Sequence, residues 1–432
     1  MRDIIVFLLV FGTIPLIFRR PYVGVLVWAW LGYMNPHRLA WGPAHDFPFA
    51  QIIGVVTLAA FLFSSERKRV PLNGIVIAWI AFILWTNVTT LFALVPDQAQ
   101  LEWDRVMKIQ LFSFVSLMLI YGKDRINYLV YVIAASIGFY AVKGGIFAIL
   151  TGGGARVYGP KGSFIEDNNG LGLAIVMTVP LMVYVLSQIE KKQLRMLMLG
   201  AIGLSVLAAL STQSRGAFLA ISATVGFLWL RSNKKLLIGV IIAIAAPIFF
   251  FSMPQSWHDR MATISEYEQD GSAMGRINAW GFAYNLAKDR PFVGGGFAVF
   301  VPEMFPDYAP EPDDFHDAHS IYFEILGEHG FVGLALFLAL GVLTFFAAGG
   351  IVRDSKGIEE LAWANALGRA LQACLVAYAT GGLFLGLAYW DLYYHFVVLV
   401  LVLRQHVAQH RAEAAVPEPT APEPRGAVVP SA

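Results

Sequence analysis

The chain has 432 residues, of which 57% are hydrophobic and 14% are charged, and its mean hydropathy is +0.62. So few polar side chains could not cover a soluble domain, so we expect an all-α, polytopic integral membrane protein. The charged residues, with a formal net charge of +1, fall in separate inter-helix segments and form no single patch, so we infer no nucleic-acid partner. The single cysteine, Cys374, lies in an apolar run and indicates no redox compartment.

Membrane-spanning helices need about 20 apolar residues to cross about 30 Å of hydrocarbon. By this measure the sequence has twelve or thirteen candidate spans. They are 4–18, 22–34, 50–63, 73–95, 106–121, 126–150, 170–188, 195–211, 216–230, 236–252, 320–350, 361–388 and 391–404. The N-terminal segment has no small-residue cleavage site, so we expect it to be retained.

Lys and Arg collect in alternate connections, and such short basic loops stay in the cytoplasm. The predicted cytoplasmic loops are 66–69, 121–125, 190–195, 231–235, 352–357 and the tail after Arg404. The predicted outer segments are 96–105, 151–169, 211–216, 253–319 and the turn near Tyr389. Arg19 and Arg20 would place Met1 outside, and the sequence alone leaves the topology of this end open.

We divide the chain into three parts. N-terminal transmembrane helices occupy 1–150, and a core with amphipathic helices in its long outer loop, 253–319, occupies 151–404. The final segment, 405–432, is rich in Ala, Pro and Glu and nearly free of aromatic residues, so we expect a disordered cytoplasmic tail.

Arg215 lies in STQSRGAF, a turn between two apolar segments that is too short to be a solvated loop. A cation at that depth is costly unless it is paired or lines a wet cavity. The adjoining residues Ser211, Thr212, Gln213 and Ser214 all carry hydrogen-bonding groups. The alternative is a helix-end arginine that reaches the membrane surface. We interpret Arg215 as a candidate binding residue.

The outer segment 151–169, TGGGARVYGPKGSFIEDNN, carries Arg156 and Lys161 among glycines. Gly-rich backbone beside cations can approach a phosphate closely. Walker-type spacing is absent and the segment faces away from cytoplasmic nucleotide, which argues against ATP binding. Just before the next apolar run stand Asp167, Asn168 and Asn169, which are typical of helix N-caps.

Two further candidates lie in or next to the long outer loop. Arg276 begins an amphipathic stretch with several aromatic residues, typical of a helix lying on the bilayer surface, where its guanidinium would meet a lipid-linked phosphate. His319 directly precedes the next apolar periodicity and can titrate near neutral pH. The competing histidines are His316, which sits among carboxylates, and His329. For any of the three, the alternative is a hydrogen-bonded structural residue.

The helix that follows His319 is predicted to be longer than the membrane requires, so we expect a break near Gly327 and Gly330. Its entry is rich in metal-ligand side chains, namely Asp313, Asp314, His316, Asp317 and His319. These suit a divalent cation. Their spacing matches no established metal signature and such loops are usually solvated, so we expect no metal.

A solute or ion transporter is the alternative of another class. It would need ionisable groups at mid-membrane, and Lys143 and Arg369 are the candidates. No internal repeat is evident, which disfavours transporter folds built from inverted halves.

Three short motifs together resemble the O-antigen ligase and polymerase superfamily: SRG at 214–216, GRxxxW at 275–280 and HSxYxxxxGExG at 319–330. The resemblance covers roughly 150–400. The segment RRPYVGVLVWAWLGYMNPHRL resembles the subgroup of exosortase-associated O-glycosylation ligases.

The resemblance implies a twelve-span transferase of the bacterial inner membrane with both termini cytoplasmic. Its implied activity is transfer of a glycan from undecaprenyl pyrophosphate to an acceptor hydroxyl on the periplasmic side, with lipid A-core as acceptor in lipopolysaccharide biosynthesis, and with no metal or other cofactor. It assigns pyrophosphate binding to Arg215 and Arg276, with Arg156 and Lys161 as further matches, and catalysis to His319. A polysaccharide polymerase and a protein O-oligosaccharyltransferase remain alternatives within the family.

In the mechanism that we expect, arginines balance the charge of the leaving pyrophosphate through bidentate hydrogen bonds. His319 accepts the proton of the acceptor hydroxyl. Direct displacement would invert the anomeric configuration, and the polyprenyl tail would lie in an apolar groove open to lipid.

Overall fold

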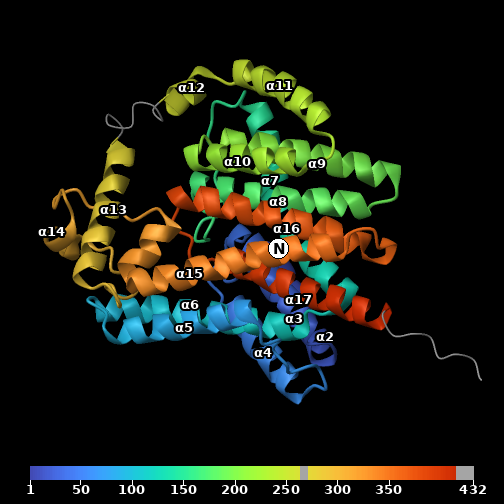
Figure 1. Ribbon diagram of the computed structural model, residues 1–432, viewed down its shortest axis with the longest axis horizontal. Helices are drawn as coiled ribbons and strands as arrows, with labels where there is room; N and C mark the ends of the chain where they lie inside the picture. Colours follow the sequence, from blue (N-terminus) through green and yellow to red (C-terminus); the bar gives the residue numbers. More distant parts are fainter. Residues whose placement is uncertain (263–270, 415–432) are drawn as a thin grey trace, which may run out of the picture.

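The computed structural model describes residues 1–262 and 271–414, which fold into helices without a strand among them. Figure 1 shows most of the helices running roughly parallel to one another as a bundle. The α-helices are α1 (Arg2–Gly12), α2 (Ile14–Arg19), α3 (Tyr22–Met34), α4 (Phe49–Phe63), α5 (Gly74–Leu91), α6 (Pro96–Leu119), α7 (Gly122–Leu150), α8 (Asn168–Gln188), α9 (Lys192–Ser211), α10 (Arg215–Arg231), α11 (Lys235–Ser252), α12 (Gln255–Ala262), α13 (Gly271–Asp289), α14 (Phe305–Tyr308), α15 (Ile321–Asp354), α16 (Ala362–Gly381) and α17 (Asp391–Ala414). The short 3₁₀ helices include η1 (Pro36–Leu39) and η5 (Gly382–Phe384).

Within the described residues, five helices are long and apolar enough to cross a membrane: α5, α7, α8, α9 and α15. The shorter apolar helices include α3 and α4, and an apolar part of α11. The chain is therefore a multi-pass membrane protein, as its composition predicts. The predicted number of about twelve spans stays a prediction.

The predicted spans overlap with helices, and three differences stand out. The segment 96–105, which we expected to be an outer loop, is the first part of α6, where ion pairs such as Lys108 Nζ to Asp104 Oδ2 (2.5 Å) join neighbouring turns. The segment 4–18 is divided between α1 and α2, with Pro15 in the first turn of α2.

The third difference is at the C-terminus. The helix α17 continues to Ala414, although we expected disorder from 405 onward. Residues 404–414 carry a mixture of charged, polar and alanine side chains, which suits an exposed helix end as well as a tail. The rest of the predicted tail, 415–432, lies outside the described residues.

The N-terminus packs against the connection between α3 and α4. The Asp3 carboxylate accepts hydrogen bonds from the backbone N–H groups of Gly42 and Ala44, both at 3.1 Å. Met1 therefore lies on the same side as 39–48, at the opposite end of α4 from the basic segment 66–69.

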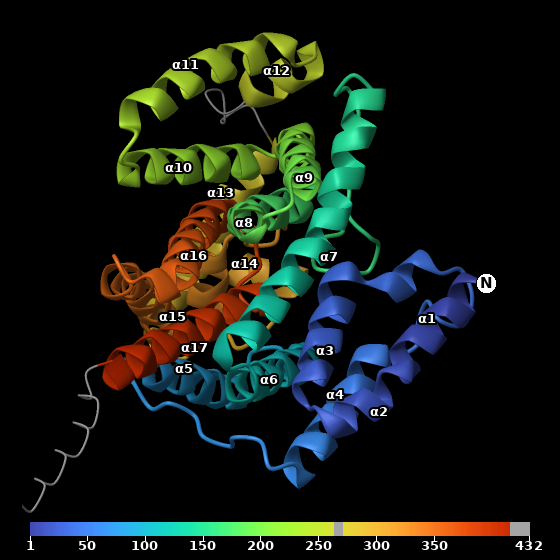
Figure 2. The ribbon, with the colours of Figure 1, turned by 90° about the vertical axis from the view of Figure 1, so that its right-hand side faces the viewer.

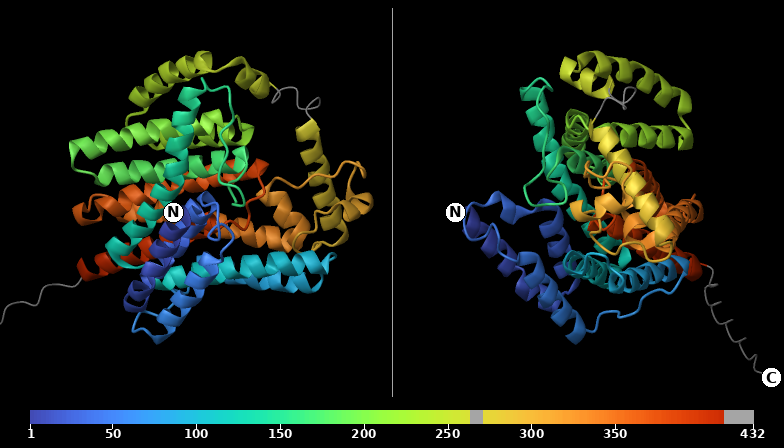
Figure 3. Two further views of the ribbon diagram at one scale, coloured as in Figure 1. Left: turned by 180° about the vertical axis from the view of Figure 1, so that it is seen from behind. Right: turned by 90° about the vertical axis from the view of Figure 1, so that its left-hand side faces the viewer.

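The middle of the bundle is formed by α5, α6, α8, α15, α16 and α17, which share one large hydrophobic core. Figures 2 and 3 show α7 crossing the α8–α9 pair obliquely, with the group α1 to α4 on one side of the molecule and α11 and α12 on the other. The helices α13 and α14 lie together at one end of the bundle (Figure 1).

The helix α13 lies at one end of the bundle and runs across the direction of the bundle helices (Figure 1), and the expectation that it lies on the bilayer surface stays a prediction. Its apolar face, which includes Phe282 and Leu286, is fully buried against α14 and α15. The rings of Phe282 and Phe305 stack with centroids 4.7 Å apart. Burial of this face fixes α13 to the entry of α15, so the residues that it carries have defined neighbours.

The predicted break in α15 is confirmed at Gly330, where the backbone leaves the helical region with φ of +67°. A Cβ on Gly330 would lie 2.5 Å from the carbonyl oxygen of Phe292. Only glycine fits both the positive φ and this close backbone approach. The break separates a short first part of α15 from the long second part.

Candidate functional site

The turn between α9 and α10 holds Arg215 as the first residue of α10, half-buried. The preceding Ser214 caps the helix, with its Oγ accepting from the backbone N–H of Ala217 at 3.2 Å. Gln213 adopts a left-handed φ of +55°, and its amide nitrogen lies 3.5 Å from the carbonyl oxygens of Gly153 and Gly154. The predicted short, polar turn is thus tied to the loop 151–167.

Arg156 of that loop and the first residue of α8 also contact the turn. Arg156 Nε donates to Gln213 Oε1 at 3.4 Å, and Asn168 Nδ2 donates to the carbonyl oxygen of Thr212 at 2.8 Å. Asp167 is the confirmed N-cap of α8, because its Oδ1 accepts from the backbone N–H of Asn169 at 2.8 Å. The loop therefore carries Arg156 and Asp167 to the α9–α10 turn.

Lys161 has different neighbours. It is exposed, and the adjoining Gly162 packs so closely on η1 that a Cβ there would lie 3.1 Å from Arg38 Cζ. Nearby, the Arg105 guanidinium lies 4.0 Å from the centroid of the Phe164 ring. Arg38 and Arg105 are cations that sequence reasoning missed, because nothing in the sequence indicates that η1 and α6 meet this loop.

The helix α13 fixes the chain that leads into α15. Asn278 clamps the preceding loop, because its Nδ2 donates to the carbonyl oxygens of Glu311 and Asp314, both at 2.8 Å. One turn after Arg276, the Trp280 indole N–H donates to the carbonyl oxygen of Ala318 at 2.8 Å. Arg276 itself is half-buried. The predicted arginine and the residue before His319 are thereby held to the same helix.

His319 is half-buried and has a left-handed φ of +42°, a conformation that is uncommon for a residue with a Cβ. Burial lowers the pKa of its imidazole below the ordinary value of 6.5; Asp317 and Asp167 act to raise this pKa, while Arg276 and His316 act to lower it further. His319 thus lies within electrostatic reach of Arg276 on α13 and of Asp167 in the loop 151–167. Because its pKa is lowered, the His319 imidazole is uncharged at neutral pH.

The 3₁₀ helix η5 connects the helix ends that carry these residues. A Cβ on Gly216, next to Arg215, would lie 3.3 Å from the Phe384 Cβ, and the Trp280 and Phe384 ring centroids are 6.3 Å apart. On the other side, Gly382 abuts Ile321, two residues after His319. The structure therefore gathers the segments of Arg215, Arg276 and His319 at one end of the bundle, with Arg156 at the α9–α10 turn.

Three other residues of the acidic entry segment, Asp314, His316 and Asp317, have local partners. The His316 imidazole packs on the backbone of Gly275, where a Cβ would lie 2.4 Å from the ring, and its Nδ1 lies 3.2 Å from Asp314 Oδ1. Asp317 accepts from the backbone N–H of Ala318 at 2.8 Å. In the part of the chain that the structure describes, no group of three or more His, Cys, Asp or Glu side chains is arranged to hold a metal ion.

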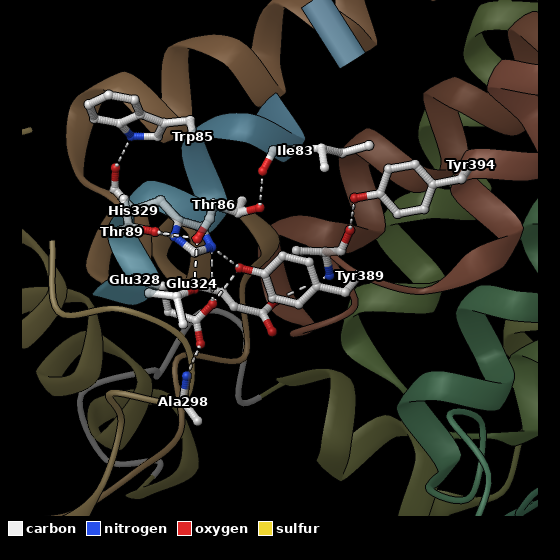
Figure 4. Close-up of polar contacts among 12 residues, drawn as sticks. Ile83, Trp85, Thr86, Thr89, Ala298, Glu324, Glu328, His329, Tyr389 and Tyr394 are labelled. Atoms are coloured by element: carbon white, nitrogen blue, oxygen red, sulfur yellow. Dashed lines mark hydrogen bonds and ion pairs between the residues drawn. The ribbon is translucent and has the colours of Figure 1, made fainter. Parts of the chain in front are cut away.

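A buried polar cluster lies deeper in the bundle, around the break in α15 (Figure 4). His329 Nδ1 lies 2.6 Å from Thr89 Oγ1, and His329 Nε2 lies 2.7 Å from the Tyr389 hydroxyl oxygen. Tyr389 donates to the Glu328 carboxylate, which also accepts from the backbone N–H of Ala298 at 2.7 Å. The cluster ties α5, the turn before α14, α15 and the connection to α17 together.

This cluster is the part of the molecule that sequence reasoning missed. The only sequence signal is a Glu-His pair inside an otherwise apolar run. We grouped His329 with the histidines that could compete with His319, but its side chain is fully buried and both ring nitrogens have partners. For His329, the structure therefore supports the alternative interpretation, a hydrogen-bonded structural histidine.

Residues 199–338 match the family model described as O-antigen ligase. The chain carries an O-antigen ligase domain. This domain runs from α9 into the second part of α15 and includes Arg215, Arg276 and His319. Residues 1–190 match the model of a family of unknown function, DUF5935, and this part includes Arg156, Lys161 and Asp167. No curated protein matches the chain.

The match to the O-antigen ligase family supports a membrane enzyme of the ligase or polymerase type, and the family implies lipid-linked glycans and their acceptors as substrates in general. The candidate site is built from both matched parts. The loop 151–167 comes from the first, and α10, α13 and the start of α15 come from the O-antigen ligase domain. The segment η5, which joins them, follows both.

Proposed function

We propose that the protein transfers a glycan from undecaprenyl pyrophosphate to a hydroxyl of lipid A-core on the periplasmic side of the bacterial inner membrane. The observation that carries this proposal is His319 of the O-antigen ligase domain. Its imidazole is kept neutral by burial and by the charge of Arg276, and it stands where α13, α15 and the loop 151–167 meet. A neutral imidazole beside cations suits deprotonation of a hydroxyl next to a bound phosphate.

In the proposed reaction, His319 accepts the proton of the acceptor hydroxyl while its oxygen forms a bond to the anomeric carbon of the donor. The bond from that carbon to the pyrophosphate oxygen breaks, and undecaprenyl pyrophosphate leaves with the electron pair. Because one displacement occurs, the anomeric configuration inverts. Arg215 and Arg276 balance the negative charge that grows on the leaving group, with Arg156 as a further cation. Lys161 keeps its proposed role in phosphate binding only if the loop 151–167 rearranges around the donor.

The polyprenyl tail of the donor has a suitable groove. An apolar groove of about 350 Å³ lies between α8, α9, α10 and α16, and its lining includes Val176, Ala209, Ile221 and Ala370. Ala209 is two residues before the end of α9, so the groove begins beneath the turn that carries Arg215. A pyrophosphate at this turn would leave its hydrocarbon chain in the groove.

The sidedness that we propose follows from the basic loops. The segments 66–69, 121–125, 190–195, 231–235 and 352–357 lie at the helix ends opposite the α9–α10 turn and the entry of α15. Because basic loops stay in the cytoplasm, the candidate site faces the periplasm. The donor would be presented there by the outer leaflet.

A transporter has less support from the side chains that it would need. Lys143 and Arg369 are both exposed, and each lines a groove at the surface of the bundle, Arg369 in the groove of α8, α9, α10 and α16. Arg369 Nε donates to Asn365 Oδ1 at 3.0 Å. Transport across the bundle would need ionisable groups that face an interior pathway. Neither cation belongs to the buried polar residues of the bundle, which gives a transport pathway through its interior less support.

The test is a reconstituted transfer assay. The purified full chain in proteoliposomes receives an undecaprenyl-pyrophosphate-linked glycan and, in separate reactions, lipid A-core, a second donor molecule or a hydroxyl-bearing peptide. We expect glycosylated lipid A-core and release of undecaprenyl pyrophosphate. Elongated donor would instead identify a polymerase, and glycosylated peptide a protein O-oligosaccharyltransferase. Absence of all three products would contradict the proposed reaction.

A further inference from the structure

Lys143 lies on α7 close to the point where this helix crosses α9. The crossing is tight because Gly144 and Gly145 face α9, and a Cβ on Gly145 would lie 2.2 Å from the carbonyl oxygen of Leu204. Leu204 precedes Ser211, the last residue of α9, by seven positions, which is ~10 Å along the helix axis. Lys143 is therefore held well below the end of the bundle that carries the candidate site.

The surroundings of Lys143 are apolar. Toward the end of α7, the side chains of Ile146, Ile149 and Leu150 are 47%, 61% and 79% exposed, as expected where a helix faces lipid. Among the residues that the structure describes, no carboxylate oxygen lies within 4.0 Å of the Lys143 ammonium. An ammonium group that faces hydrocarbon at this depth is costly unless an anion or water meets it.

Lys143 lines a groove of about 670 Å³ between α7, α8 and α9. Its walls include Gly138, Phe139, Met182, Val185, Met198 and Ala201. This volume lies within the usual range of ligand pockets, about 300–1,000 Å³, and flexible methionine side chains adapt to irregular hydrocarbon shapes. The lining contains one cation and no carboxylate. A matching ligand therefore has a hydrocarbon chain and a negatively charged head.

We propose that this groove binds an anionic phospholipid whose phosphate contacts Lys143 and whose acyl chain lies between Met182 and Met198. Charge complementarity supports a phosphate-bearing head, and the apolar walls support an acyl chain. The site shares no lining residue with the groove of α8, α9, α10 and α16 that we assign to the donor's tail. The bound lipid would fill the space between α7 and the α8–α9 pair, independently of glycan transfer.

The experiment measures lipid binding by the full chain. Protein delipidated in detergent is titrated with phosphatidylglycerol, and bound lipid is counted by native mass spectrometry. Lys143→Met keeps most of the side-chain volume and removes the charge, so the first phosphatidylglycerol should bind about tenfold more weakly, the scale of one lost charge-assisted contact. Lys143→Arg should bind like the wild type. Ala201→Phe, which fills the groove without changing charge, should also weaken binding.

Lys288→Ala is the matched control, because it removes an exposed lysine on α13 that does not line this groove. This variant should bind phosphatidylglycerol as the wild type does. Equal affinity of Lys143→Met and the wild type would overturn the proposal. Undecaprenyl phosphate is the competing probe. If it binds more tightly than phosphatidylglycerol and this preference is lost in Lys143→Met, the occupant is a polyprenyl lipid and the phospholipid assignment is wrong.

Discussion

His319 combines a left-handed backbone, φ of +42°, with partial burial at the junction of three segments. Such conformations persist only where the surroundings impose them, and they concentrate at functional sites. Here the neighbouring Ala318 is bonded on both sides, to Trp280 through its carbonyl oxygen and to Asp317 through its N–H. These contacts fix the backbone next to His319, which supports its role as the base in the proposed reaction.

The first prediction concerns pH. If neutral His319 is the base, activity falls as the pH drops through its pKa, which lies below 6.5 because burial and Arg276 disfavour the imidazolium. Arg276→Gln removes a cation that lowers this pKa, so the acid limb of the pH–rate profile should move to higher pH. Asp167→Asn removes a carboxylate that raises the pKa but keeps an N-cap, so the limb should move to lower pH. An acid limb that stays fixed in both variants contradicts the assignment of His319.

The second prediction concerns the arginines. Arg215→Lys and Arg276→Lys keep the charge but lose the planar two-bond contact to phosphate oxygens. Each should reduce kcat/KM by roughly 10- to 150-fold, which corresponds to about 1.5–3 kcal/mol. Arg290→Lys, just after the end of α13, is the control, because Arg290 donates to the carbonyl oxygen of Phe92 and is not assigned to the donor. Wild-type kinetics in both site variants would remove the arginines from the phosphate site.

At the scale of elements, the sequence predicts most helices because apolar runs of membrane length have few alternatives. The break at Gly330 is also predictable, from a helix that is too long and has glycines near its start. The helix at 96–105 could not be predicted, because its many charged residues are typical of a loop. Its ion pairs between neighbouring turns form only once the segment is helical. The role of His329 could not be predicted, because its partners Thr89 and Tyr389 are distant in the chain.

The third prediction tests the break in α15. Alanine at Gly330 would meet the carbonyl oxygen of Phe292 at 2.5 Å and would adopt an unfavourable positive φ. Gly330→Ala should therefore lower the free energy of unfolding by about 1–3 kcal/mol and lower the Tm in detergent. Gly200→Ala is the matched control, since a Cβ there has no neighbour within 4 Å. An unchanged Tm in Gly330→Ala would show that the break contributes little to the fold.

At the scale of the whole molecule, the candidate site is assembled across the two matched parts. The O-antigen ligase domain, 199–338, supplies Arg215, Arg276 and His319, while the part of unknown function supplies the loop with Arg156 and Asp167. The segment η5, beyond both, packs on Gly216, Trp280 and Ile321. The motifs identify the individual residues, but only the fold shows that these distant segments meet.

The fourth prediction concerns metals. The proposed reaction relies on arginines and a histidine, so transfer by the intact protein should be unchanged by EDTA. The measurement is the initial rate of glycan transfer in proteoliposomes before and after chelation. Loss of activity that one added divalent cation restores would favour the metal alternative for the acidic entry segment of α15.

The most direct test of the account is single-turnover transfer by His319→Ala in proteoliposomes, with an undecaprenyl-pyrophosphate-linked glycan and lipid A-core. We expect the rate to fall about 10²–10⁴-fold, the range for removing a positioned acid–base group, while donor binding and Tm stay close to the wild type. His316→Ala is the control and should have a mild effect. Near-normal transfer by His319→Ala, or abolition by His316→Ala in its place, would contradict the central claim that His319 is the base.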